Sequence, residues 1–202
     1  MEGSRQKLKL SFNAPAVLGF AAICVIAQVL NLLTGGASNR TVFSVYRASL
    51  SQPLTWVRWV CHVFGHADWT HLMNNMMVLL LLGPMLEEKY GTSNLIFVML
   101  ATALATGAVI MLFFPKVALL GASGIVFAFI LLSSITSTQT GTIPVTFLLV
   151  AVLYLGEQLY QSLFVADNVS QLGHIIGGVV GSALGFTMDR LGMNRYKGKD
   201  HA

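Results

Sequence analysis

Long apolar runs recur along the chain, separated by short polar segments that contain glycine, proline or charged residues. Several runs are close to 20 residues long. At a rise of about 1.5 Å per residue, roughly 20 helical residues match a hydrocarbon core about 30 Å thick. We therefore predict six membrane-spanning helices, at residues 14–33, 70–85, 93–114, 122–134, 143–164 and 172–191.

These runs divide the chain into three parts: an N-terminal segment (1–13), a membrane domain (14–191) and a basic tail (192–202). The longest connection inside the membrane domain covers residues 34–69. It mixes arginines with tryptophan, tyrosine and phenylalanine, which is typical of segments at the membrane interface. We expect short helices there that lie on the membrane or dip into it.

The fourth run is short for a span, so we expect it to begin below the membrane surface. Ser123 lies at its start, in the sequence G-A-S-G. Backbone N–H groups in the first turn of a helix have no intrahelical partner and could stabilise an oxyanion beside a serine hydroxyl. Taken alone, however, this tetrapeptide is more typical of close helix packing than of catalysis.

Composition supports the membrane interpretation. Hydrophobic residues make up 55% of the chain and charged residues only 10%, and the mean hydropathy is +0.72. Soluble domains carry roughly 25% charged residues, so this class is excluded. We predict an integral, multi-pass membrane protein, and the compact chain suggests a bacterial plasma membrane.

Basic residues predict the orientation of the spans. With a cytoplasmic N-terminus, eight of the twelve basic residues lie on the cytoplasmic side, and both termini are cytoplasmic. The net charge of +4 follows from this topology and gives no separate indication of nucleic-acid binding. The second, fourth and sixth spans then run in the same direction, and their first residues share one membrane depth.

Polar residues gather at these three span starts. The second span opens with His66, His71 and Asn75, the fourth with Ser123 and the sixth with His174. Polar residues inside a membrane are costly and often mark function. We therefore interpret this set as one candidate site.

Close packing is the competing interpretation of the sixth span, where glycines recur every four residues. A histidine on such a smooth face is more often a packing residue than a base. Yet Gly124 offers a complementary flat surface on the fourth span, which would bring Ser123 and His174 together. The glycines at and around this predicted contact are Gly121, Gly124, Gly173, Gly177, Gly181 and Gly185.

A metal site is a weaker alternative. His62 and His66 have the i, i+4 spacing of helical metal ligands, but no acidic residue completes an H-E-x-x-H arrangement. Cys24 and Cys61 are not at ligand spacing and are poorly placed for a disulfide. We predict neither a metal nor a cofactor.

Four motifs, in this order and spacing, make the chain resemble the rhomboid family of intramembrane serine proteases from about residue 15 to residue 190. They are H-A-D-W-T-H-L-M-N-N-M (66–76), G-x-x-x-E-x-x-x-G (83–91), G-A-S-G (121–124) and G-H-I-I-G-G-V-V-G (173–181). The resemblance implies an all-α, six-helix rhomboid-type bundle.

The resemblance also implies residue roles. Ser123 would be the nucleophile and His174 the base of a dyad, while His71, Asn75 and the Ser123 backbone N–H would bind the oxyanion. Phe127 would stack on the base. Supporting roles would fall to Arg58, Glu87, His66, Gly121, Gly124, Gly177 and Gly181. Three positions, Val57, Phe127 and Gly173, depart from the commoner tryptophan, tyrosine and alanine.

The function implied is hydrolysis of peptide bonds in or next to transmembrane segments of membrane protein substrates. The outer half of the fifth span carries Glu157, Gln158 and Gln161, which is unusually polar for a lipid-facing helix. Inward hydrogen bonding is the slightly favoured explanation; the other is that the second and fifth spans, with residues 165–170, form a movable gate for substrates. A catalytically silent rhomboid-like chaperone that binds transmembrane helices is the alternative, although such proteins typically lack the serine or the histidine. A transporter would need paired charges or broken helices along a through-path, which the inner halves of these spans do not show.

Overall fold

The structure, a computed structural model, describes residues 12–135, 145–146, 148–150, 152–153, 156 and 168–193. This part of the chain is mostly helical. In order, it contains α1 (Pro15–Leu33), α2 (Ala37–Thr41), β1 (Val45–Tyr46), α3 (Pro53–Cys61), the 3₁₀ turn η1 (His62–Phe64), α4 (Trp69–Tyr90), α5 (Thr92–Phe113), β2 (Ala118–Leu119), α6 (Ser123–Ile135) and α8 (Asn168–Arg190).

Five of the six predicted runs correspond to the helices α1, α4, α5, α6 and α8, with bounds that differ by at most five residues. The predicted fifth span lies largely outside the described residues, as do residues 1–11 and 194–202. The largest differences are at two helix ends. α4 continues through Pro84 to Tyr90, and α8 already begins at Asn168, inside the segment predicted as a gating loop.

Among the described helices, only α1 and α5 are both long enough and apolar enough to cross a membrane by those criteria alone. α6 and residues 173–188 of α8 are shorter apolar helices. The six-span count and the cytoplasmic position of both termini therefore stay predictions.

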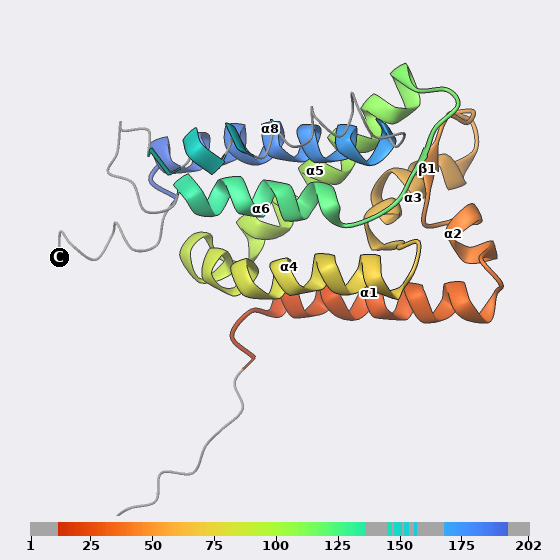
Figure 1. Cartoon of the computed structure of the whole chain (residues 1–202), viewed down its shortest axis with the longest axis horizontal. Coiled ribbons are helices and arrows are strands. Elements are labelled where there is room, and N and C mark those ends of the chain that lie inside the picture. The colour runs from red at the N-terminus through yellow and green to blue at the C-terminus, as the bar shows by residue number, and fades with distance from the viewer. Residues whose placement is uncertain are drawn as a thin grey trace, which may run out of the picture.

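The helices form a bundle in which α6 lies between α4 and α8, as Figure 1 shows. α4, α6 and α8 run in the same general direction, as the sequence predicts, and α1 runs the opposite way beside α4. Eight of the thirteen residues of α6 are buried, so this short helix is the centre of the bundle. The site residues on α6 are thereby held by packing from several sides.

Glycines let α6 and α8 approach at backbone distance. A Cβ atom at Gly177 would collide with the carbonyl group of Gly124, and one at Gly181 would collide with the backbone of Ala128. The glycine repeat of the sixth predicted span is therefore a packing surface for α6. This contact determines the position of α8 along the axis of α6.

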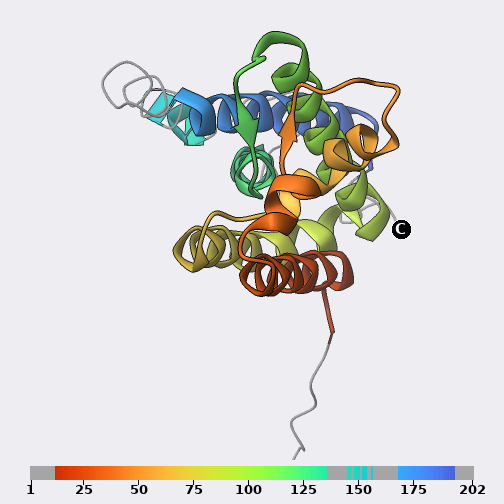
Figure 2. The same ribbon diagram turned by 90° about the vertical axis from the view of Figure 1, so that its right-hand side faces the viewer.

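The connection between α1 and α4 is attached to the segment that leads into α6. β1 and β2 pair antiparallel, with Val45 opposite Leu119 and Tyr46 opposite Ala118. Figure 2 shows this pair of strands beside the start of α6. The all-α prediction missed it, because strands of two residues have no detectable hydrophobic periodicity.

Arg58 and Glu87 make structural contacts. Arg58 Nε donates to the Thr41 carbonyl at 2.8 Å, and its guanidinium lies over the Tyr46 ring at 4.5 Å from the centroid. The Glu87 carboxylate accepts from the backbone N–H groups of Ala16 at 3.0 Å and Val17 at 3.1 Å. It thus pairs free donors in the first turn of α1, where a negative charge is favoured. These contacts fit the supporting roles that the resemblance implies.

The substitution Gly177→Ala tests the contact between α6 and α8. The added methyl group would overlap the Gly124 backbone, which cannot rotate away as a side chain can. We expect a loss of about 2 kcal/mol, or roughly 5 °C in Tm. Thermal unfolding in detergent measures it.

Gly19→Ala in α1 is the matched control, because a Cβ there meets nothing within 4 Å. Its Tm should stay the same or rise slightly through helix propensity. Equal Tm values for the two variants would contradict the close α6–α8 packing.

Candidate active site

Ser123 is the first residue of α6, as expected from the sequence. The chain reaches it through Gly121, whose φ of +127° is open to glycine but strained for other residues. The Gly121 N–H donates to the His62 carbonyl at 3.0 Å, and the Ala122 N–H points to His66 Nε2 at 3.5 Å. The end of the first connection therefore fixes the path into the helix that carries Ser123.

His66 supports this path from a buried position. It lies three residues before α4, in the connection rather than at the opening of the second span where the sequence analysis placed it. Its Nδ1 lies 3.2 Å from the Phe64 carbonyl, which assigns the ring proton to Nδ1 and leaves Nε2 as an acceptor for Ala122. Burial, followed by the nearby His71, lowers the pKa of His66 from 6.5 to about 4.

The His71 ring lies beside Gly121, two residues before Ser123. The Ala67 N–H points to its Nδ1 at 3.5 Å, so the ring proton is assigned to Nε2. A Cβ atom added at Gly121 would lie 3.0 Å from His71 Nε2 and 3.8 Å from Ser123 Oγ. Gly121 thus leaves a small space bordered by both groups.

Asn75 lies one turn after His71 on α4. Its side chain is buried, with 6% of its surface exposed, and its amide nitrogen has no hydrogen-bond partner among the described residues. Most buried polar groups are paired, and leaving a donor unpaired costs about 1–3 kcal/mol. An amide donor is therefore available for an additional group.

His174 lies on α8 next to the first turn of α6. The carbonyl oxygen of the preceding residue, Gly173, is 3.2 Å from the point where a Gly124 Cβ would be. The His174 ring stacks on Phe127, with the ring centroids 4.3 Å apart and the planes 7° from parallel. The expected stacking is present, and it holds the imidazole over the first turn of α6.

The His62 ring bonds within the first connection. His62 is buried, and its Nδ1 lies 3.2 Å from the Arg58 carbonyl and 3.1 Å from the Trp59 carbonyl. Burial lowers the pKa of His62 to about 4. Within the described ranges, no group of three or more histidine, cysteine or acidic residues could hold a metal ion.

Two threonines behind α6 were missed in the sequence analysis. Thr102 and Thr106 lie one turn apart on α5, both are buried, and neither hydroxyl has a partner among the described residues. Thr106 Oγ1 and Thr102 Cγ2 are each 3.6 Å from the position of a Gly124 Cβ. The signal that would have found them is a T-x-x-x-T pair on one face of an apolar helix.

Comparisons with known proteins identify the family of this chain. The family model described as the Rhomboid domain matches residues 53–190. The chain is 26% identical over 176 residues to "Rhomboid protease GlpG" of Yersinia pestis (strain Pestoides F), and 28% identical over 177 residues to the protein of that name from Serratia proteamaculans (strain 568). Each alignment covers 85% of this chain and 62% of the relative, so the chain spans less than two thirds of these relatives.

The buried, neutral histidines predict acid sensitivity. Their pKa values are lower in the folded chain than the unfolded value of 6.5, so unfolding below pH 6.5 takes up protons. Stability is therefore full above pH 6.5 and falls toward pH 4, by about 1.4 kcal/mol per pH unit for each histidine. His66→Gln should reduce this slope by that amount, measured by denaturant unfolding from pH 7 to 4.5. An unchanged slope would contradict the neutral, buried state of His66.

Proposed function

Because the chain belongs to the rhomboid family, we propose that it is an intramembrane serine endopeptidase with a Ser123–His174 dyad. The observation that carries the proposal is the meeting of three helix starts. The first turn of α6 borders the His71 ring on one side and contacts α8, next to His174, on the other. A nucleophile, a base and oxyanion donors are the parts that acyl transfer needs.

In the first step, Ser123 Oγ attacks the scissile carbonyl carbon and His174 takes the hydroxyl proton. The C–N bond then breaks, and His174 returns the proton to the leaving amine. A water molecule, activated by the same imidazole, hydrolyses the acyl-enzyme and restores Ser123. The Phe127 ring, stacked on the imidazole, helps to orient it.

The negative charge that develops on the carbonyl oxygen needs donors that are already in place. His71 Nε2–H, the Asn75 amide and the backbone N–H of Ser123 would supply them. The unpaired state of the Asn75 nitrogen supports this role, because no bond within the described residues has to break before it binds the oxyanion. Loss of one such donor typically costs about 3–4 kcal/mol of transition-state stabilisation.

The substrates we propose are transmembrane segments of other membrane proteins, met within the lipid bilayer. Their helices must unwind before a peptide carbonyl reaches Ser123, so small or helix-breaking residues should lie near the cleaved bond.

The chain would be a multi-pass protein of a bacterial plasma membrane with both termini cytoplasmic. The proposed gate involves the fifth span, which lies largely outside the described residues.

The hydrolytic step also needs water in an apolar bundle. Thr102 and Thr106 provide two buried hydroxyls beside Gly124 that can hold water behind the nucleophile. The presence of both Ser123 and His174 in the sequence favours the protease over the catalytically silent alternative.

Cleavage of a transmembrane substrate in liposomes tests the proposal. Ser123→Ala and His174→Ala should each reduce cleavage to background. Ser134→Ala is the matched control, since its hydroxyl lies on the same helix and bonds to the Ile130 carbonyl. It should cleave at the wild-type rate. Wild-type cleavage by Ser123→Ala would contradict the proposed mechanism.

The double substitution Thr102→Val and Thr106→Val tests the role in water supply. It keeps side-chain shape but removes both hydroxyls, so we expect kcat to fall about tenfold while the unfolding free energy stays the same or rises. Thr187→Val removes a hydroxyl that bonds to the Ala183 carbonyl on α8 and should leave kcat unchanged. Equal kcat values for the double variant and the wild type would contradict this role.

A further inference from the structure

A pocket lined by polar and apolar residues lies between the end of α1 and the start of α4. Its volume is about 330 Å³. Figure 1 shows the end of α1 and the start of α4, which border this pocket, at the right-hand end of the molecule. Its lining combines carboxamide, carboxylate and apolar side chains with two glycines: Gln28, Asn31, Leu32, Gly35, Gly36, Ala67, Asp68 and Trp69.

Acceptor atoms without donors mark one side of this pocket. Gln28 is buried, with 4% of its surface exposed, and its Oε1 has no hydrogen-bond partner among the described residues. The same holds for Oδ1 of Asn31, one turn further along α1. Asp68 adds a carboxylate, of which Oδ1 accepts from the His71 backbone N–H at 2.8 Å. Carbonyl and carboxylate oxygens together suit a cation that carries N–H donors.

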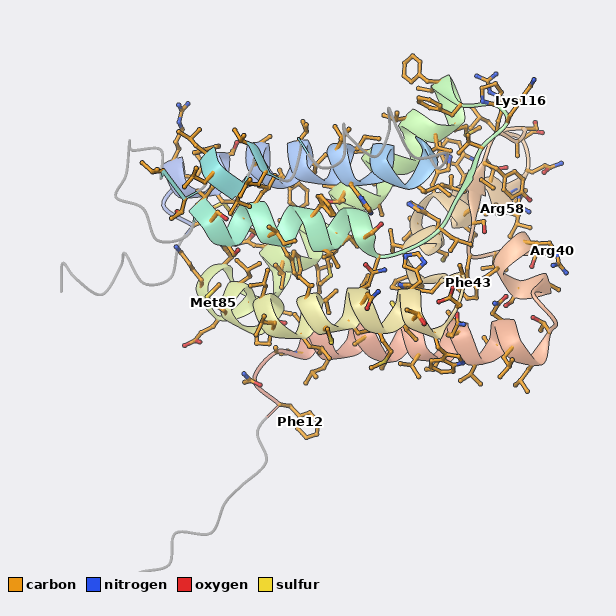
Figure 3. The ribbon with its side chains drawn as sticks, in the orientation of Figure 1. Phe12, Arg40, Phe43, Arg58, Met85 and Lys116 are labelled. Atoms are coloured by element: carbon orange, nitrogen blue, oxygen red, sulfur yellow. The ribbon has the colours of Figure 1, made fainter. Side chains whose placement is uncertain are left out.

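A positive charge lies beside the two glycines of the lining. The Arg40 guanidinium lies over the glycine turn: Nη1 is 2.9 Å from the point where a Gly36 Cβ would be, and Nη2 is 3.4 Å from the Gly35 carbonyl. Figure 3 shows Arg40 at the outer side of this end of the molecule. A guanidinium fork matches a phosphate group.

The remaining rim is apolar and exposed. Leu32 has 68% of its surface exposed and Trp69 has 45%. Tryptophan is enriched at the level of lipid headgroups, where one part of the ring is apolar and the N–H is wet. The pocket therefore has an anionic side, a cationic rim and an apolar edge at one end of a membrane helix.

We propose that this pocket binds the headgroup of an ethanolamine phospholipid. The primary ammonium meets Asp68 and the oxygens of Gln28 and Asn31, the phosphate meets Arg40, and the acyl chains follow Leu32. A choline headgroup has no N–H to donate, so it leaves the unpaired oxygens unsatisfied. An anionic glycerol headgroup places no positive charge at Asp68.

The site also touches the supports of His71. Ala67 and Asp68 line the pocket, and both hydrogen-bond to His71, through its Nδ1 and its backbone N–H. Lipid bound there would order the start of α4. This consequence for catalysis rests on the proposed function, whereas lipid binding itself does not.

Native mass spectrometry of the purified full chain tests the binding. The protein is incubated with equal amounts of ethanolamine, choline and glycerol phospholipids of the same acyl chains. We expect the wild type to retain the ethanolamine lipid at least fivefold over the others. Asp68→Asn should abolish this preference while keeping the N-cap, because asparagine caps a helix as well as aspartate. Gln28→Leu and Arg40→Gln should each weaken it severalfold.

Lys116→Gln is the matched control. This exposed lysine lies at the same end of the molecule but does not line the pocket, so its loss should leave the preference intact (Figure 3). Equal retention of ethanolamine and choline lipids by the wild type, or full preference in Asp68→Asn, would overturn the proposal. So would equally tight binding of free phosphoethanolamine, because the ligand would then be a soluble molecule. This experiment measures lipid retention and not cleavage. A failure of the lipid proposal can therefore be distinguished from a failure of the proposed function.

Discussion

The backbone contact between α6 and α8 is the constraint on which the rest of the site depends. Two helices can approach this closely only where neither carries a side chain, and Gly124 and Gly177 meet that requirement. The contact brings His174 to the level of the first turn of α6, where Phe127 fixes the plane of its ring. Packing and proposed chemistry are therefore one property of this helix pair.

A second requirement is that the irregular backbone before Ser123 finds hydrogen-bond partners. In lipid, unpaired N–H and carbonyl groups are costly, so irregular segments persist only where other parts of the protein satisfy them. Here the first connection supplies the partners, through the β1–β2 pair, the His62 carbonyl and the His66 ring. The long loop and its buried histidines thus position the start of α6.

Five helices, the common direction of α4, α6 and α8, and the position of Ser123 at the start of α6 could be predicted from the sequence, because apolar run length and motif order reflect them directly. Other features depend on contacts between distant segments. The two-residue strands, the cap that Glu87 forms on α1 and the position of His66 before α4 leave no local pattern. The sequence contains the Thr102 and Thr106 pair, but only the structure shows that both side chains lie beside Gly124.

The same site explains why some helices look poorly suited to a membrane. α1 and α5 meet the length and hydropathy of a bilayer-crossing helix, and neither carries a residue proposed to touch the substrate. α4 carries the polar residues His71 and Asn75. α6 is only 13 residues long and begins at Ser123, and α8 has glycines where a spanning helix would have bulky apolar residues. The polar groups of α4, the shortness of α6 and the glycines of α8 each reduce the match to a spanning helix, and each belongs to the proposed mechanism. The short length of α6 and the lower hydropathy of its neighbours α4 and α8 therefore indicate where the proposed site lies.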